Sequence, residues 1–428
     1  MPVRNIQILV ITFVVCLACY LEARRLKYAG RIAKAMRVVE NYYVEPVKGN
    51  DLFLGAMDGI IDKLDSYSEF IPPREYQQFQ SYIEQQFGGV GILIEGPPTT
   101  ERLTVIAPLP GTPAYEAGLQ PGDVILSIDE KSTVGLKADD ATQLMRGVVG
   151  TSVKLSIRRD GQSHPHEVEL TRADIQVDSV FGDRIQADST WNFLLEEDPR
   201  IAYIRINVFG ERTVEEFQKA TRNIKASAQA LVIDLRFNPG GIVSAAVEIC
   251  DMLLESGRIV STRGRDTHFN SQHDARPGVD LPVSLPVVVM INEQSASSSE
   301  IVAACLQDSG RAKIAGDRSF GKGTVQQVFE LDGQAAIKFT TARYYRPSGA
   351  NIHRTESLRI EDAWGVLPDK ELELKLNERQ QVNLYRRWQF RGDPRKVAAS
   401  ERPPSPECSG DPQLRLVLAS IRKQLGNQ

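Results

Sequence analysis

The sequence is poor in the residues that build metal sites, disulfide frameworks and histidine-based catalytic sites. It contains five cysteines and five histidines among 428 residues. The cysteines are scattered, with neither zinc-site spacing nor a disulfide pattern: Cys16, Cys19, Cys250, Cys305 and Cys408. A Walker loop and a dinucleotide-binding fingerprint are also missing. The net charge is −4 and the charges are interspersed, so no basic patch suits nucleic acid. We therefore expect no metal, no cofactor and no nucleic-acid partner.

The few histidines also argue against a Ser-His-Asp hydrolase. All five lie in polar, loop-like stretches: His164, His166, His268, His273 and His353. Such an enzyme needs a histidine that is held beside the nucleophile by a buried carboxylate. If the chain is a hydrolase, we expect its general base to be another type of residue.

Long apolar runs are equally scarce, with one exception near the N-terminus. Residues 6–21 form an apolar stretch that only Gln7 and Thr12 interrupt. The stretch is short for a membrane span of about 20 residues, but it suits a signal-peptide core or a signal anchor. Basic residues follow it, yet long domains translocate largely regardless of such charges. We expect residues 1–26 to be a signal peptide or a membrane anchor, and the rest to be extracytoplasmic, in the periplasm or cell envelope.

The length and composition are those of a multidomain globular protein. With 428 residues and 42% hydrophobic residues, the chain should hold two or three domains. Residues 27–86 repeat apolar positions at helical spacing, for example Ile32, Met36 and Val39. This pattern predicts a helical N-terminal region that covers a core or forms a dimer face, and it indicates no catalytic role.

From residue 87 the sequence changes to short apolar strands and glycine-rich turns. The turns include Gly88-Gly89-Val90-Gly91-Ile92 and Gly118-Leu119-x-Pro121-Gly122-Asp123. One such turn is most often only a tight turn, but the order of elements over residues 87–173 resembles a PDZ domain of bacterial proteases. PDZ domains bind peptide ends by adding a strand to an open sheet edge. The resemblance implies that the loop and edge strand that bind the peptide are formed by Val90, Gly91, Ile92 and Leu93.

Strands and helices alternate in the next region, residues 174–380. Apolar segments at 201–208, 231–236 and 287–291 read as strands and are separated by helical segments. This alternation predicts a parallel α/β sheet, whose binding chemistry lies in the loops after the strands. The turn that contains Gly240 and Gly241 follows one strand, and Ser297 follows another. We expect these two loops to be neighbours.

A serine and a lysine in this region could form a catalytic pair without histidine. Ser297 lies where a strand feeds a helix, and Lys322 follows 25 residues later between Gly321 and Gly323. A serine needs a neighbouring base, and lysine is one known partner. Free lysine, with a pKa of roughly 10.4, is protonated, but burial lowers that value. The amide oxygen of Gln326 could hold the neutral amine.

Backbone N–H groups near Ser297 are candidates for stabilising an oxyanion. The N–H of Ser298 lies at the positive end of the predicted helix. Gly240 and Gly241 permit close backbone approach, so an N–H from this turn could be the second donor. Simpler interpretations exist for each feature. Ser297-x-x-Glu300 is also a helix capping box, Lys322 could be a surface charge, and the glycines could form an ordinary strand-to-helix turn.

Several motifs in order resemble the carboxyl-terminal processing peptidases, also called tail-specific proteases. They are Asp234-Leu-Arg236-x-Asn238-Pro-Gly-Gly241, Ser295-Ala-Ser297-x-Ser299-Glu300-Ile301 and Phe320-Gly321-Lys322-Gly323-x-Val325-Gln326. Residues 340–349 and 365–369 match the same family, and the resemblance runs from about residue 33 to residue 377. A segment like the family's last helix begins near Asp411-Pro412-Gln413.

The resemblance implies an α/β fold: a ClpP/crotonase-like protease core (174–380) with an inserted PDZ domain (87–173). A helical segment (27–86) would precede these domains, and a linker with a C-terminal helix (381–428) would follow them. The family's spacing to Lys322 selects Ser297 among the neighbouring serines. Ser297 would be the nucleophile, Lys322 the general base and Gln326 the residue that positions the lysine.

The implied function is a serine endopeptidase that cleaves C-terminal regions of exported or unfolded proteins without metal or ATP. The PDZ domain would capture the substrate's C-terminus, and Arg146 in its last helix is a candidate for gating. The resemblance leaves open whether the chain forms a homo-oligomer or uses an adaptor. Two alternatives are a PDZ-containing pseudoprotease that only binds tails and a crotonase-type acyl-CoA enzyme. The second would not explain a PDZ domain or an export signal.

Overall fold

The computed structural model describes most of the chain. The described residues are 5, 7, 11–17, 27–73, 75–76, 79–80, 86–96, 102–186, 188, 190–331, 335–355, 359, 362–392 and 410–426. They divide into two compact units, Met1–Tyr76 with Gln326–Thr340, and Gln77–Val325 with Thr341–Gln428. Much of the predicted export segment, residues 1–26, lies outside the described residues. Within the described part, no helix has the length and apolar character needed to cross a membrane.

The first unit contains the N-terminal helices and a small sheet. The helical pattern predicted for residues 27–86 gives α2 (Lys27–Tyr42) and α3 (Gly49–Ile61). The sequence did not predict β1 (Glu69–Ile71), which pairs antiparallel with residues 336–338 of β21 (Ala335–Tyr345). β20 (Thr324–Leu331) also pairs with β21. Helix α3 is thus followed by a strand whose pairing partner, β21, comes from a distant part of the sequence.

The PDZ region forms a sheet with the strand order β3-β4-β5-β7-β8. Its strands are β3 (Ile92–Glu95), β4 (Thr104–Pro108), β5 (Val124–Ile128), β7 (Ser152–Arg158) and β8 (His166–Thr171), and β6 (Lys131–Ser132) pairs with β5. The helices α5 (Pro113–Glu116) and α6 (Ala138–Met145) contribute Ala114, Ala141 and Met145 to the core. Because β3 lies at the end of this order, one of its sides is an edge.

The chain enters and leaves the PDZ region through a pair of neighbouring strands. β2 (Gln86–Gly89) pairs antiparallel with β9 (Ala173–Gln176). This pairing brings both connections of the domain to one place, which is the geometry that an inserted domain needs. Gly88 of β2 also lies close to Gly147, and a Cβ on Gly88 would collide with the carbonyl oxygen of Gly147.

The core of the second unit is a mostly parallel sheet with the order β10-β14-β15-β18-β19. Its bounds are β10 (Val180–Phe181), β14 (Asp198–Ile206), β15 (Ala230–Asp234), β18 (Val287–Ile291) and β19 (Lys313–Gly316), and the short β13 (Leu194–Leu195) pairs with β14. Strands β14, β15, β18 and β19 run parallel. Every residue of β15 and β18 is buried, as expected for a parallel sheet that is covered on both faces.

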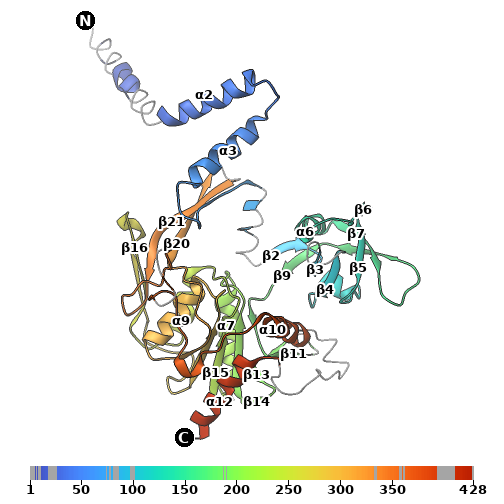
Figure 1. Cartoon of the computed structure of the whole chain (residues 1–428), viewed down its shortest axis with the longest axis vertical. Helices are drawn as coiled ribbons and strands as arrows, with labels where there is room; N and C mark the ends of the chain where they lie inside the picture. The colour runs from blue at the N-terminus through green and yellow to red at the C-terminus, as the bar shows by residue number, and fades with distance from the viewer. Residues whose placement is uncertain are drawn as a thin grey trace. The chain divides into compact units, whose positions relative to one another are not determined.

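Helices cover both faces of this sheet (Figure 1). One face packs against α7 (Thr213–Ile224), α8 (Val243–Asp251) and α9 (Ser298–Asp308). The other face, which includes Val232 and Val288, packs against α12 (Pro412–Gly426). Alternate residues of the strands therefore serve two separate cores. The predicted mixed α/β fold with a PDZ domain is confirmed.

Smaller elements complete the second unit. A second sheet joins β16 (Arg258–Gly264) to β17 (Ser271–Asp274) and to residues 342–345 of β21. The short elements are β11 (Arg184–Ile185), β12 (Trp191–Asn192), η1 (Thr267–Phe269) and η2 (Lys370–Leu372). α10 (Glu378–Arg391) is capped by Asn377, whose side chain accepts a hydrogen bond from the N–H of Gln380.

α10 occupies residues that the sequence assigned to the linker of the 381–428 segment. The helix is held there because Tyr385 and Trp388 pack against Phe237. Arginines in a helix of this kind look like a solvated linker in sequence, yet Arg391 is buried against Asp183. The rest of the predicted linker, residues 393–409, lies outside the described residues.

Candidate active site

Ser297 lies at a strained turn between β18 and α9. Its φ is 54° and its ψ is −112°, a backbone conformation that non-glycine residues rarely adopt. Three neighbouring serines hold the turn in place by donating to backbone carbonyls of the 235–241 segment. Ser295 donates to Leu235 (2.8 Å), Ser298 to Gly241 (3.0 Å) and Ser299 to Asn238 (3.0 Å). Three of the four candidate serines therefore have structural hydrogen bonds to this segment.

The hydroxyl of Ser297 instead lies against the phenol of Tyr344, a residue that the sequence analysis did not single out. Tyr344 is 3% exposed and belongs to β21. Burial raises the pKa of Tyr344 to about 12, while its hydrogen bond with Ser297 opposes this rise and the nearby charge of Glu300 adds to it. The phenol is therefore neutral at physiological pH. The sequence carried the tyrosine in a matching motif, but nothing in its spacing indicated contact with Ser297.

Glu300 joins the serine turn to the lysine loop. One carboxylate oxygen, Oε2, accepts from the backbone N–H groups of both Ser297 (2.9 Å) and Lys322 (2.8 Å). The other, Oε1, accepts from the hydroxyl of Ser319 (2.6 Å) and the N–H of Gly321 (2.7 Å). Burial raises the pKa of Glu300, and these hydrogen bonds pull it back only partly. Glu300 thus acts as the helix cap that the sequence suggested, and it also fixes the backbones of both predicted catalytic residues.

The glycines beside Lys322 are required by close contacts. Gly321 has a φ of 87°, and a Cβ there would lie 2.8 Å from the Cβ of Arg354. A Cβ on Gly323 would collide with the backbone N of His353. Lys322 itself is half-buried. The loop can therefore present a lysine only because both of its neighbours lack side chains.

Gln326 belongs to β20 in the other compact unit. There its Nε2 donates to the hydroxyl of Thr340 at 2.7 Å. This bond fixes the orientation of the amide within its own unit. The role of Gln326 in holding the lysine amine stays a prediction.

The predicted oxyanion donors differ in their surroundings. The N–H of Gly240 donates to the side chain of Asn238 at 2.8 Å, so it is already engaged. Within the described part of the chain, the N–H groups of Gly241 and Ser298 make no hydrogen bond. Gly240 instead serves close packing, because a Cβ on it would lie 2.8 Å from the Cβ of Ser297. The geometry favours Gly241 and Ser298 as the pair of donors.

A buried ionic network behind the 235–241 segment was missed by the sequence analysis. Arg236 is inaccessible to solvent and pairs with Asp234 (2.6 Å) and Asp411 (2.8 Å). Asp234 also accepts from the hydroxyl of Tyr203 at 2.6 Å, and Arg236 donates to Gln413 at 2.9 Å. The network ties α12 to the end of β15, just before the oxyanion turn. Its signal was the Asp-x-Arg pattern together with Asp411 and Gln413, which the motifs contained without a stated role.

The predicted peptide-binding residues of the PDZ region occupy two different environments. Val90 is 2% exposed and packs in the domain core, so only its backbone can face a ligand. Gly91 has a φ of 75°, and its carbonyl accepts from the N–H of Leu109. Ile92 and Leu93 begin the edge strand β3, and Leu93 is well exposed. Arg146 directly follows α6 as its C-cap residue, and burial lowers the pKa of its guanidinium.

These features are those that acyl transfer at a serine requires. Ser297 is buried and Lys322 is half-buried, and the carboxylate of Glu300 binds the backbone N–H groups of both. A serine and a lysine held in this way, with two available N–H groups nearby, suit attack on an amide carbonyl. Within the described ranges, no group of three His, Cys, Asp or Glu side chains is arranged to hold a metal ion. The class of protein that the fold and the site indicate is a serine hydrolase with a peptide-binding module.

Comparisons with known proteins give the same class and specify the family. Residues 200–372 match peptidase family S41, and residues 104–159 match a PDZ domain. The carboxy-terminal-processing protease of Bartonella bacilliformis is 34% identical over 365 residues, which cover 84% of this chain and 78% of that protein. The carboxyl-terminal-processing protease of Synechocystis sp. is 33% identical over 339 residues, with coverages of 79% and 75%. Carboxy-terminal processing protease CtpB of Bacillus subtilis is 32% identical over 341 residues, with coverages of 78% and 67%.

The chain belongs to peptidase family S41 and is a serine-type peptidase with a PDZ domain. The predicted resemblance and the enzyme class are confirmed. The peptidase interpretation is also supported over the alternative of a PDZ-containing pseudoprotease.

Proposed function

We propose that this peptidase cleaves the C-terminal regions of exported or unfolded proteins, with Ser297 as nucleophile and Lys322 as general base. The observation that carries the proposal is the shared Oε2 atom of Glu300. It accepts from the N–H groups of both residues, so the two backbones are held within a few ångströms of each other. The relatives are named as carboxy-terminal-processing proteases, which supports cleavage in the C-terminal regions of substrates.

The proposed reaction follows the Ser-Lys scheme. Lys322 Nζ takes the proton from Ser297 Oγ as the oxygen attacks the scissile carbonyl carbon. The N–H groups of Gly241 and Ser298 stabilise the oxyanion, and the protonated lysine then gives its proton to the leaving amine. Water hydrolyses the acyl-enzyme by the same steps with a second proton transfer. The amide oxygen of Gln326 would orient the lysine amine.

Substrate capture is assigned to the PDZ domain. The edge of β3 has unpaired backbone groups that an extended peptide could join as a new strand. The left-handed backbone of Gly91 turns the chain just before this strand, as a carboxylate-binding loop requires. In this proposal the substrate's terminal carboxylate binds at Val90 and Gly91, and its last residues lie along Ile92 and Leu93. Arg146, the candidate for gating, would change its position when the substrate's C-terminus binds.

We also propose an extracytoplasmic location with N-terminal membrane association. The support is the apolar stretch at residues 6–21, which precedes α2 in the sequence. Self-association of the chain is proposed through the exposed apolar side chains of α2, which include Ile32 and Val39. A topology reporter fused after residue 428 tests the location, and light scattering of the purified chain tests the self-association.

The activity itself is tested with the full chain and an unfolded protein that ends in an apolar C-terminus. We expect cleavage near that end, abolished in both Ser297→Ala and Lys322→Ala. Cleavage that survives in either variant would refute the site. Cleavage that is unchanged when the substrate's C-terminus is blocked would refute tail capture, and loss of activity with chelators would refute a metal-free mechanism.

A further inference from the structure

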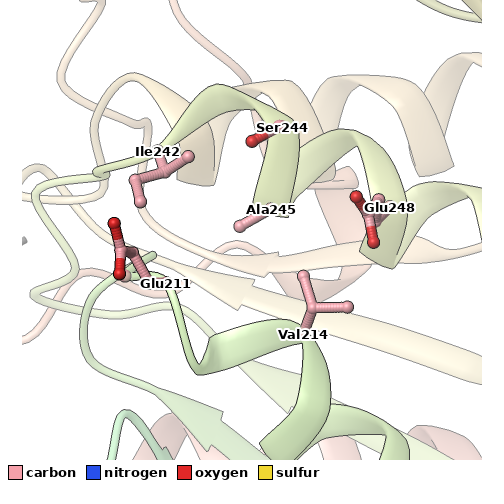
Figure 2. Close-up of a pocket in the computed structure, with 7 residues that line it drawn as sticks. Glu211, Val214, Ile242, Ser244, Ala245 and Glu248 are labelled. Atoms are coloured by element: carbon pink, nitrogen blue, oxygen red, sulfur yellow. The ribbon is translucent and has the colours of Figure 1, made fainter. Parts of the chain in front are cut away.

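A cavity of about 370 Å³ lies beside the predicted oxyanion turn and is not used by the reaction described above. It is bounded by the N-terminal parts of α7 and α8 (Figure 2). The residues that line it are Gly210, Glu211, Val214, Ile242, Ser244, Ala245 and Glu248. A volume of this size is in the range of small ligand pockets, so it can hold a long side chain.

The cavity begins where the oxyanion turn ends. The N–H of Phe209 donates to the carbonyl of Gly240, and the N–H of Ile242 donates to the carbonyl of Phe209. These two hydrogen bonds involve the residues on either side of Gly241. One wall of the cavity begins at Gly210, directly after Phe209, and the other begins at Ile242, directly after Gly241. Gly241, whose carbonyl accepts a hydrogen bond from the hydroxyl of Ser298, immediately precedes Ile242 of the cavity wall, so the cavity lies next to the proposed oxyanion donors.

The cavity has an apolar middle and two acidic sides. Figure 2 shows Val214, Ile242 and Ala245 between Glu211 and Glu248, which lie on different walls. In the part of the chain that the structure describes, neither carboxylate forms a salt bridge or a hydrogen bond. Such a lining suits a side chain with an aliphatic stem and a polar end.

The electrostatic balance favours a positive end. The basic groups next to the cavity are engaged elsewhere, Arg212 with Glu216 (3.4 Å) and Arg276 with Asp251 (2.6 Å), although the charge of Glu248 also acts on Arg276. The N-termini of α7 and α8 contribute roughly half a positive charge each. The two full negative charges of Glu211 and Glu248 exceed this contribution, so the cavity is negative overall.

We propose that this cavity is a specificity subsite that accepts a lysine or arginine side chain of the substrate, close to the scissile bond. The aliphatic stem would lie on Val214, Ile242 and Ala245, and the cationic end would bind Glu211 or Glu248. The proposal rests on Ser297 as the nucleophile, because that residue sets where the scissile bond lies. It predicts that this chain prefers a basic residue at one fixed position relative to the cleaved bond.

The test maps cleavage sites made by the full chain in a mixture of unfolded proteins by mass spectrometry. We expect lysine and arginine to be enriched at one position. Each of Glu211→Gln and Glu248→Gln should reduce this enrichment about fivefold, the upper range for an exposed ion pair, because both glutamates are exposed. Glu248→Lys should shift the preference toward acidic residues. The matched control is Glu215→Gln, which removes an exposed glutamate of α7 that does not line the cavity.

The outcomes separate this proposal from the proposed function. Cleavage without any fixed basic position, or with an enrichment that all glutamate variants retain, overturns the subsite and leaves the peptidase site untouched. Binding provides a second readout that needs no turnover. Unfolded peptides that differ only by lysine or glutamine at the mapped position are titrated into Ser297→Ala, and equal affinities would also overturn the subsite. Loss of cleavage in Ser297→Ala with the lysine preference for binding retained supports both.

Discussion

The protease core and the PDZ region use buried polar groups in different ways. In the core, Arg236, Ser295, Ser298 and Glu300 are essentially inaccessible to solvent, and each is hydrogen bonded to the segments that carry the site. In the PDZ region, the comparable ion pair of Asp123 and Arg159 reaches the surface. The difference shows where precision is needed. Chemistry requires a backbone that is fixed from behind, whereas strand addition requires a backbone with an open edge.

The largest expected effect on activity comes from Ser297, whose side chain, unlike those of the three neighbouring serines, does not bind the 235–241 segment. Ser297→Ala should lower kcat/KM by about 10⁴-fold or more, because nucleophile removal leaves only binding and oxyanion effects. The midpoint of thermal unfolding should change little. Ser295→Ala is the matched variant, because it breaks a buried bond to Leu235 and should cost about 1–3 kcal/mol of stability. If Ser295→Ala abolished activity and Ser297→Ala only lowered stability, Ser297 would not be the nucleophile.

Glu300→Gln tests whether the carboxylate joins the serine and lysine segments. The glutamine amide has one oxygen and one NH₂ group, whereas both oxygens of Glu300 accept hydrogen bonds from N–H or O–H donors. The NH₂ group of the variant would face such donors and could not accept from them. We expect kcat to fall about 100-fold, the order of loss for a small misplacement of catalytic groups. Steady-state kinetics and circular dichroism measure the two effects. Full activity in this variant would remove Glu300 from the site.

The raised pKa of Glu300 also gives a pH dependence. The folded state holds this proton more tightly than the unfolded state does, so the group's contribution to stability grows as the pH falls through the raised pKa toward about 4.3. It is lost as the pH rises through the folded pKa. Activity should change in the opposite direction, because protonation removes an acceptor from the lysine loop. Unfolding and rate measurements over the same pH range check both signs.

Two arginine variants compare the regions directly. Arg236→Met leaves Asp234 and Asp411 buried without their partner and should cost about 3–5 kcal/mol. Arg159→Met breaks the partly exposed pair in the PDZ region and should cost about 1 kcal/mol or less. Chemical denaturation of the full chain, followed with a probe in each region, gives both numbers. Equal losses of stability in the two variants would contradict the difference drawn between the protease core and the PDZ region.

Gly91→Val tests the open edge of the PDZ region. The residue has a φ of 75°, and a side chain there would collide with Thr112. Strain of about 1–3 kcal/mol at this loop should raise KM for a protein tail roughly tenfold. The kcat for a short peptide that bypasses tail capture should not change. A fall in that kcat would instead place the PDZ loop in the chemistry.

The smallest effect is expected at Tyr344. Tyr344→Phe removes the hydroxyl that contacts Ser297 and keeps the buried ring. The loss of one hydrogen bond of about 0.5–1.5 kcal/mol should reduce kcat by a few-fold. Because burial keeps the phenol neutral up to about pH 12, the alkaline limb of the pH–rate profile should be the same in both proteins. A shifted limb would mean that the tyrosine titrates during the reaction.

The sequence predicted the fold class and the segments of the site, but not how they are held together. Strand and helix patterns suffice for the parallel core because β15 and β18 are apolar throughout. Several contacts of the site join residues that lie far apart in the chain. They are Glu300 with the lysine loop, Tyr344 with Ser297, Ser295 with Leu235, and Ser299 with Asn238. The local sequence pattern carries no information about such contacts. The engagement of the Gly240 N–H by Asn238 is a two-residue contact, yet a glycine pair in sequence does not reveal which N–H stays available. α10 was missed because its arginines look solvated.

The most direct test of the central claim is a double-mutant cycle for Ser297 and Lys322. The kcat/KM of the full chain, of Ser297→Ala, of Lys322→Ala and of the double variant is measured on one unfolded protein substrate. If the two residues act as one catalytic unit, the double variant should be no slower than the slower single variant. Losses that multiply in the double variant would show that the two residues act independently, and they would contradict the Ser-Lys mechanism.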